Sequence, residues 1–140
     1  MTMDEQVAIY KEDLNLFDDK DLKMDYVLDY AKEAQKLDAS KKTEANIVKG
    51  CSSLAWLDKN YEDGKVHLNA EGDSIIAKGM LVILLSIFSN RTPEEILAFD
   101  PKKLLEMGVM ELLSPVRQQG MEAFLNLIYS YAKSCKETTQ

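Results

Sequence analysis

The side chains in this sequence that could carry chemistry on their own are two cysteines and one histidine. Cys51 lies in the stretch Lys49-Gly50-Cys51-Ser52, just before a short apolar run, whereas Cys135 lies within a helical pattern. Glycine and serine are loop residues, and loops held by a regular element are where proteins present reactive thiols. We therefore take Cys51 as the candidate reactive residue, with a buried and inert cysteine as the alternative.

A cysteine hydrolase would need a base beside the sulfur of Cys51. The single histidine, His67, is expected on the strand face opposite Val66 and Leu68, which is typical of a surface histidine. The sequence holds no CxxC or HxxxH spacing for zinc or iron, and no glycine-rich phosphate loop for a nucleotide. Sulfur exchange is the chemistry that remains, because one thiolate replaces another and no water has to be activated.

Sulfur exchange requires a thiol that is accessible and has thiolate character. Lys49 and the backbone N–H groups of the turn at Gly50 could supply the positive potential that favours a thiolate. A metal or iron–sulfur scaffold, a cysteine-dependent hydrolase that uses His67, and an interaction module with an inert Cys51 stay as alternatives.

Length and charge limit the class of protein. The chain has 140 residues, 46% of them hydrophobic, which fits one domain with one core, 1–140. The net charge of -7 argues against a nucleic-acid partner. The most apolar run, 75–88, is 14 residues long, short of a membrane span. With two distant cysteines and an early run of charges, we expect a reduced, cytoplasmic protein.

The elements that must position Cys51 are of mixed type. Two amphipathic helical patterns occupy 1–40. Strand patterns and the cysteine loop occupy 46–70: 54–57 and 65–70 form a hairpin around Glu62-Asp63-Gly64. Because two strands alone would be marginal, we expect a third at 46–49, just before the cysteine.

Helices follow over 74–136. The first, 75–89, is apolar nearly all round, with Asp73 or Ser74 as its cap, and Gly79 within it predicts a close backbone approach. Three further helix starts carry a capping residue followed by proline, at Thr92-Pro93, Asp100-Pro101 and Ser114-Pro115, and at the first of them Glu95 predicts a capping box. Together these patterns predict an α+β fold in which helices pack on one face of a small antiparallel sheet.

An ordered set of residues then resembles the SufE/CsdE family, the sulfur-acceptor proteins of iron–sulfur cluster assembly. The set covers about 45 to 130: Asn46-x-Val48-x-Gly50-Cys51-x-Ser53-x-x-Trp56, Ile76-Ala77-Lys78-Gly79, Thr92-Pro93-Glu94-Glu95-Ile96, Phe99-Asp100, Met107-Gly108-Val109 and Leu113-Ser114-Pro115-Val116-Arg117-Gln118-Gln119-Gly120. A single Gly-Cys pair would indicate nothing, but this ordered set is specific.

The resemblance implies a carrier rather than an enzyme. Such proteins take persulfide sulfur from a PLP-dependent cysteine desulfurase onto the cysteine matching Cys51, stimulate the desulfurase and pass the sulfur to an iron–sulfur scaffold. The chain itself would bind neither PLP nor a cluster, and we expect a monomer or weak homodimer. The implied fold, like that of U-type scaffolds, has a three-stranded sheet and places the cysteine on a loop tip beside a hydrophobic cavity.

The residues expected to orient the loop or bind the partner are Lys49, Gly50, Ser52, Asp73 and Arg117. Arg117 matches the family's arginine at the start of the last helix, where it would orient the loop or meet the desulfurase; the alternative is a surface arginine. Glu106 is a weaker candidate of the same kind. Three departures from the family pattern occur, the first of which affects the loop beside the cysteine: Glu71-Gly72-Asp73, Ala55 and Val116.

Overall fold

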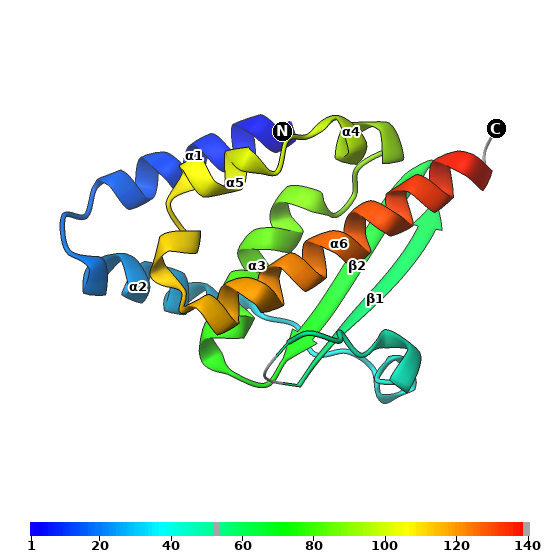
Figure 1. Ribbon diagram of the computed structural model, residues 1–140, viewed down its shortest axis with the longest axis horizontal. Helices are drawn as coiled ribbons and strands as arrows, with labels where there is room; N and C mark the ends of the chain where they lie inside the picture. The colour runs from blue at the N-terminus through cyan, green and yellow to red at the C-terminus, as the bar shows by residue number, and fades with distance from the viewer. Residues whose placement is uncertain (52–53, 139–140) are drawn as a thin grey trace.

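The computed structural model describes residues 1–51 and 54–138, which form helices and one β-hairpin (Figure 1). The first half holds α1 (Met3–Asn15), α2 (Lys20–Asp29), the 3-10 turns η1 (Tyr30–Glu33), η2 (Ala39–Lys41) and η3 (Glu44–Asn46), and the strands β1 (Ala55–Glu62) and β2 (Lys65–Gly72). The second half holds α3 (Ile75–Phe88), α4 (Pro93–Ala98), α5 (Lys102–Met107), the 3-10 turn η4 (Met110–Leu112) and α6 (Pro115–Thr138). The α+β class predicted from the sequence is confirmed.

The hairpin has the turn that its sequence predicts. Glu62 pairs with Lys65, and Asp63 and Gly64 between them have φ values of 55° and 75°, as a two-residue hairpin turn requires. The strands alternate, with Ala55, Leu57, Val66, Leu68 and Ala70 buried. β1 continues past the predicted end of its apolar run, because pairing with β2 carries the polar residues 58–62 into the sheet.

The prediction of a third strand over 46–49 is wrong: in the described residues the sheet has two strands. Ile47 forms a single antiparallel bridge with Trp56, and the N–H of Val48 donates to the carbonyl of Ala55 at 2.9 Å. The pairing stops there because η3 ends at Asn46 on one side and Gly50 adopts φ 91° on the other. The stretch of extended backbone between η3 and Gly50 is too short to form a strand.

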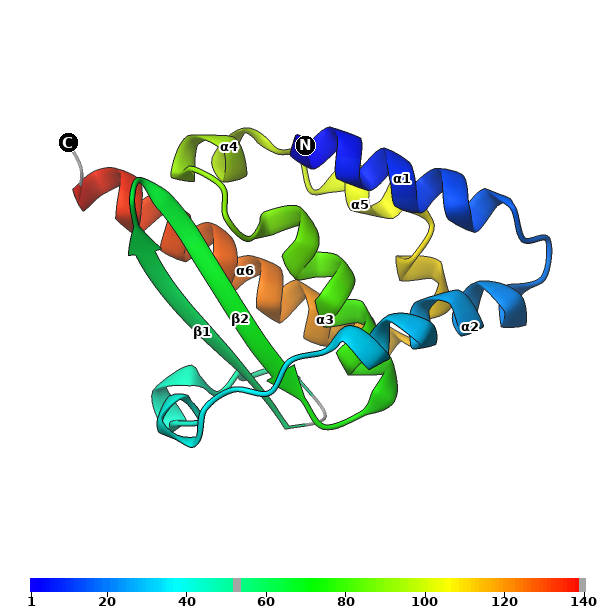
Figure 2. The same ribbon diagram turned by 180° about the vertical axis from the view of Figure 1, so that it is seen from behind.

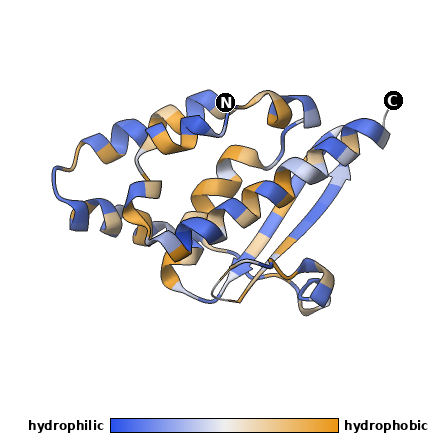
Figure 3. Cartoon of the chain, in the orientation of Figure 1, coloured by the Kyte–Doolittle hydropathy of each residue, from blue (hydrophilic) through white to orange (hydrophobic). Residues whose placement is uncertain are grey.

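Helices α3 and α6 cover one face of the hairpin, and the apolar colouring is densest on α3 (Figures 1 and 3). The predicted close approach at Gly79 is confirmed: a Cβ added there would lie 2.3 Å from the carbonyl oxygen of Val27 in α2. The backbones of α2 and α3 are therefore in direct contact. Helices α1 and α5 pack side by side on the other side of α3 from the hairpin (Figure 2).

The capping residues fix where these helices begin. Ser74, rather than Asp73, caps α3 by accepting the N–H of Ala77 at 3.1 Å. Thr92 and Glu95 form a complete capping box at α4, as the sequence predicts. In the N-terminal part, α2 ends at Asp29. The α-helical structure is therefore shorter than the region 1–40 for which the sequence predicted helices.

Candidate functional site

Cys51 lies on a loop that two features hold in place. Upstream, the bridge at Ile47 and the buried Val48 fix the chain to the start of β1. Next, the positive φ of Gly50 turns the backbone towards α6, where a Cβ added to Gly50 would lie 3.6 Å from that of Ala123. Cys51 is half-buried and is not joined to Cys135, which is buried on α6.

The sulfur of Cys51 rests against α6 at a glycine. A Cβ added to Gly120 would lie 3.2 Å from Sγ, closer than nine in ten such contacts in proteins. Beside it is a cavity of about 20 Å³ with mostly apolar walls, formed with Cys51 by Ala55, Ile76, Ala77, Met80, Leu113, Arg117, Gly120, Met121 and Phe124. A volume of this order holds little more than one small molecule such as water. The thiol therefore sits in the wall of a small, apolar cavity formed by β1, α3 and α6.

Arg117 is the charged residue in the cavity wall. Its side chain is half-buried, and Nη1 donates to the hydroxyl of Ser74 at 3.2 Å. Because Ser74 also caps α3, this bond ties the start of α6 to the start of α3, the two helices that border the cavity. The structure thus brings Arg117 and Cys51 into one site.

The other residues predicted for the site have different positions. Lys49 is exposed two residues before Cys51. Asp73 is also exposed, and its N–H donates to the carbonyl of Leu54 at 3.2 Å, which links the loop before α3 to the segment after the cysteine. Glu106 is exposed on α5, in the layer with α1, and is not brought to the cavity (Figure 1). Ser52 lies outside the described residues.

His67 is not placed as a base for Cys51. It pairs with Asn60, five residues along β2 from Gly72, and Gly72 pairs with Ala55 near the cysteine end. Five residues of strand span about 17 Å. His67 Nε2 instead lies 3.2 Å from the carbonyl oxygen of Glu62. The geometry gives no support to the hydrolase alternative.

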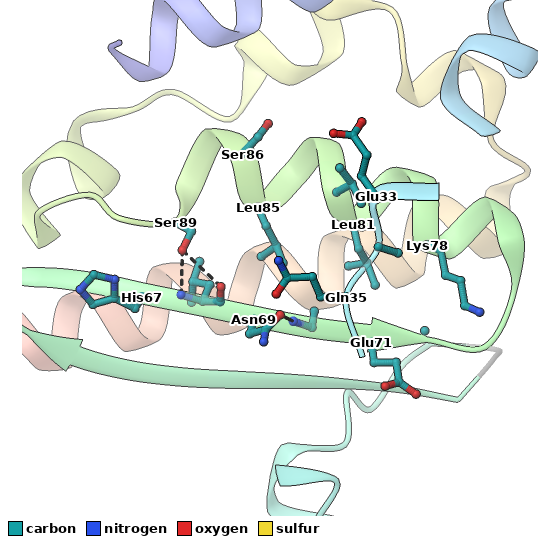
Figure 4. A pocket seen from close by; sticks show the side chains of 15 residues that line it. Glu33, Gln35, His67, Asn69, Glu71, Lys78, Leu81, Leu85, Ser86 and Ser89 are labelled. Atoms are coloured by element: carbon teal, nitrogen blue, oxygen red, sulfur yellow. Dashed lines mark hydrogen bonds between the residues drawn. The ribbon is translucent and has the colours of Figure 1, made fainter. Parts of the chain in front are cut away.

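A larger groove lies along β2, apart from the cavity beside Cys51. Its volume is about 420 Å³, and it is bordered by His67 to Gly72 of β2, residues 33–35 at the end of η1 and one face of α3 (Figure 4). Cys51 is not among its lining residues. Figure 4 shows the charged ends of Glu71 and Lys78 turned away from the groove. We therefore place the candidate site at the smaller cavity, where the thiol is.

Sequence reasoning missed the surface around this cavity. Leu54, Ile75 and Val116, which we call the apolar rim, are 47%, 63% and 51% exposed. Each directly precedes a residue that lines the cavity, at the start of β1, α3 and α6. The signal available in the sequence was an aliphatic residue at or next to the start of an element, where a polar residue would serve solubility better.

Across residues 1–51 and 54–138, no three or more His, Cys, Asp or Glu side chains gather so that they could hold a metal ion. No helix in the same ranges is both long and apolar enough to cross a membrane.

Comparisons with known proteins identify the family and a similar fold. The family model described as "SufE: Fe-S metabolism associated domain" matches residues 8–132. A solution structure of a hypothetical protein from Thermus thermophilus has a TM-score of 0.74 with 21% sequence identity, over 96% of this chain and 97% of that one. At this identity the structural likeness concerns the fold alone.

Proposed function

We propose that this chain, which belongs to the SufE family of proteins associated with Fe–S metabolism, is a sulfur acceptor and carrier. In this proposal Cys51 takes persulfide sulfur from a PLP-dependent cysteine desulfurase, which the transfer stimulates. The sulfur then passes to an iron–sulfur scaffold. The observation that carries the proposal is the position of Cys51, half-buried on a loop in the wall of a small apolar cavity.

The transfer needs no catalyst from this chain. The thiolate of Cys51 attacks the terminal sulfur of the desulfurase persulfide, and a bond forms between Sγ and that sulfur. The sulfur–sulfur bond in the desulfurase breaks at the same time, and its cysteine leaves as a thiolate. The proton stays on the transferred sulfur, and no net oxidation or reduction occurs. This exchange fits a site that holds a thiol and has no histidine beside it.

The cavity would protect the product. A persulfide on Cys51 adds one atom beyond Sγ, and the adjoining space of about 20 Å³ has room for about one such atom. Its lining is apolar apart from Arg117, so a terminal sulfur placed there would be shielded from water and from soluble thiols. Arg117 would keep the starts of α3 and α6 together beside the cavity through its bond to Ser74.

The apolar rim would be covered by the partner. Leu54, Ile75 and Val116 expose aliphatic side chains, and each is the sequence neighbour of a residue that lines the cavity. Burial of such a side chain stabilises a complex by about 1.5–3 kcal/mol when it is complete. Because these residues precede lining residues of the cavity, a desulfurase that covers them would also approach Cys51. Lys49, exposed beside the loop, would meet the same partner.

The experiment is to incubate the protein with a cysteine desulfurase and cysteine, and to measure intact and peptide masses. We expect one added sulfur on Cys51, none on the Cys51→Ser variant, and normal loading of Cys135→Ser, the matched control. His67→Ala should load as the wild type does. Sulfur found on Cys135, or on neither cysteine, would refute the proposal.

A further inference from the structure

Glu71 connects three parts of the chain on the face of the hairpin that faces away from α6. Its Oε2 lies 2.6 Å from Lys42 Nζ, and its Oε1 accepts the N–H of Leu37 at 2.8 Å. Glu71 is paired across the sheet with Trp56, and Lys42 Nζ lies 5.2 Å from the centre of the Trp56 ring. We call Glu71, Lys42 and the N–H of Leu37 the sheet clamp.

The segment that this clamp holds leads directly to the cysteine loop. Figure 2 shows the coil after η1 crossing β2 on the side away from α6. Leu37 is buried, whereas residues 38–45 are exposed. At the far end, the bridge at Ile47 and the bond from Val48 return the chain to β1. The clamp therefore holds this segment at Leu37 and Lys42 and the bridge holds it at Ile47, while residues 38–45 have little burial of their own.

The clamp is better built than an ordinary surface ion pair. The side chains of Glu71 and Lys42 are 15% and 32% exposed, and both carboxylate oxygens have a partner. Hydrogen bonds to an ionised group are about twice as strong as neutral ones. The ammonium of Lys42 also keeps the pKa of the Glu71 carboxyl below its usual value, so the carboxylate is charged at neutral pH.

We propose that Glu71 is a positioning residue for Cys51: the sheet clamp holds segment 37–48, and through it the cysteine loop, so that the thiol stays half-buried against α6. This inference rests on the proposed function for its biological meaning, since the clamp would keep the acceptor thiol in the cavity until a partner binds. It does not depend on that function for its test.

The test measures how fast iodoacetamide alkylates Cys51 and Cys135 in the folded protein, by peptide mass. In Glu71→Ala, which removes both bonds, we expect Cys51 to react about tenfold faster, the change that 1.4 kcal/mol makes in an equilibrium constant. Cys135 is buried in α6, away from the clamp, and should react at the wild-type rate. A rise at both cysteines would mean general loosening and would overturn the proposal, as would an unchanged rate at Cys51.

Three further variants separate the parts of the clamp. Lys42→Met should raise the alkylation rate of Cys51. Lys42→Arg should keep the wild-type rate, because arginine keeps the charge. Lys32→Met breaks the strongly exposed pair with Asp29 and is the matched control, with no change at either cysteine. Failure of Lys42→Arg to keep the wild-type rate would contradict the role of the charge.

Sulfur loading of the wild type distinguishes this inference from the proposed function. If the alkylation rates change as expected while the wild type accepts no sulfur from a desulfurase, the proposed function fails and the positioning of the thiol by Glu71 stands. If the wild type accepts sulfur on Cys51 while the alkylation rates do not respond to Glu71→Ala, the clamp fails alone.

Discussion

Two helical glycines mark two differently built regions of this molecule. At Gly79, α3 meets the backbone of α2, and an added Cβ would lie 2.3 Å from the carbonyl oxygen of Val27. At Gly120, α6 meets the side chain of Cys51 at the end of a loop, and the corresponding distance to Sγ is 3.2 Å. The first contact joins two helices and has no freedom to adjust. The second contact can be relieved by movement of a loop.

The difference separates the packed helices, which we call the frame, from the cysteine loop and its cavity, which we call the site. Close contact with the backbone of α2 fixes α3, one of the helices that line the cavity, whereas the thiol is held by a soft contact that a partner could open. A protein that must present a sulfur and then withdraw it needs both properties. We therefore expect substitutions in the first region to change stability, and substitutions in the second to change thiol exposure.

The largest effect is expected for Gly79→Ala. A Cβ cannot be accommodated 2.3 Å from a backbone oxygen, so α2 and α3 must separate. We expect a loss of about 3 kcal/mol in the free energy of unfolding, at the upper end of what overpacking usually costs, even though alanine favours helix. Urea denaturation measures it. A stability equal to that of the wild type would show that this contact is as soft as the one at Gly120.

The next effect is expected for Thr92→Ala, which removes the capping box of α4. The hydroxyl of Thr92 accepts the N–H of Glu95 at 3.1 Å, and loss of such a cap costs about 1 kcal/mol. Because α4 belongs to the frame, the alkylation rate of Cys51 should not change. A faster rate at Cys51 in this variant would mean that frame and site are not separable.

Gly120→Ala should have a smaller effect, and of the other kind. The gain in helix propensity, about 1 kcal/mol, offsets much of the crowding, so the free energy of unfolding should stay close to the wild-type value. The added methyl group would displace Sγ from α6. We expect alkylation of Cys51 to be roughly threefold faster, with Cys135 unchanged. A large loss of stability here would erase the contrast with Gly79.

The smallest effect is a pH dependence of the frame. The N–H of Thr92 donates to the carboxylate of Glu95 and lowers its pKa below 4.5. Since the folded-state pKa is below the unfolded one, the stabilisation is present above about pH 4.5 and is lost as pH falls through the folded value. The difference in unfolding free energy between wild type and Glu95→Gln should therefore shrink below pH 4.5. A difference that grows below pH 4.5 would contradict the lowered pKa of Glu95.

The features that the sequence predicted well are local ones. The capping box at Thr92, the hairpin turn at Gly64 and the close approach at Gly79 each depend on one residue type in a short context. The reactive-residue prediction for Cys51 rested on a similar local pattern, Gly50 before the cysteine, and stays a proposal about chemistry. Arg117, expected from the resemblance, lies in the cavity wall.

The features that escaped prediction depend on contacts between distant residues. The third strand was expected because two strands alone would be marginal, but Gly50 and η3 leave too little extended backbone for it. Glu71 was noted only as a departure from the family pattern, because nothing local indicates that it pairs with Lys42 and the N–H of Leu37. The apolar rim likewise exists only once β1, α3 and α6 are brought together.

The central claim is that Cys51 accepts sulfur directly from a desulfurase. A single-turnover experiment tests it: a desulfurase first loaded with persulfide and cleared of cysteine is mixed with this protein, and sulfur on both chains is followed by mass. We predict that the desulfurase loses its sulfur as Cys51 gains an equal amount, in the wild type and in Cys135→Ser but not in Cys51→Ser. Retention of the sulfur by the desulfurase, or its release without appearance on Cys51, would contradict the account.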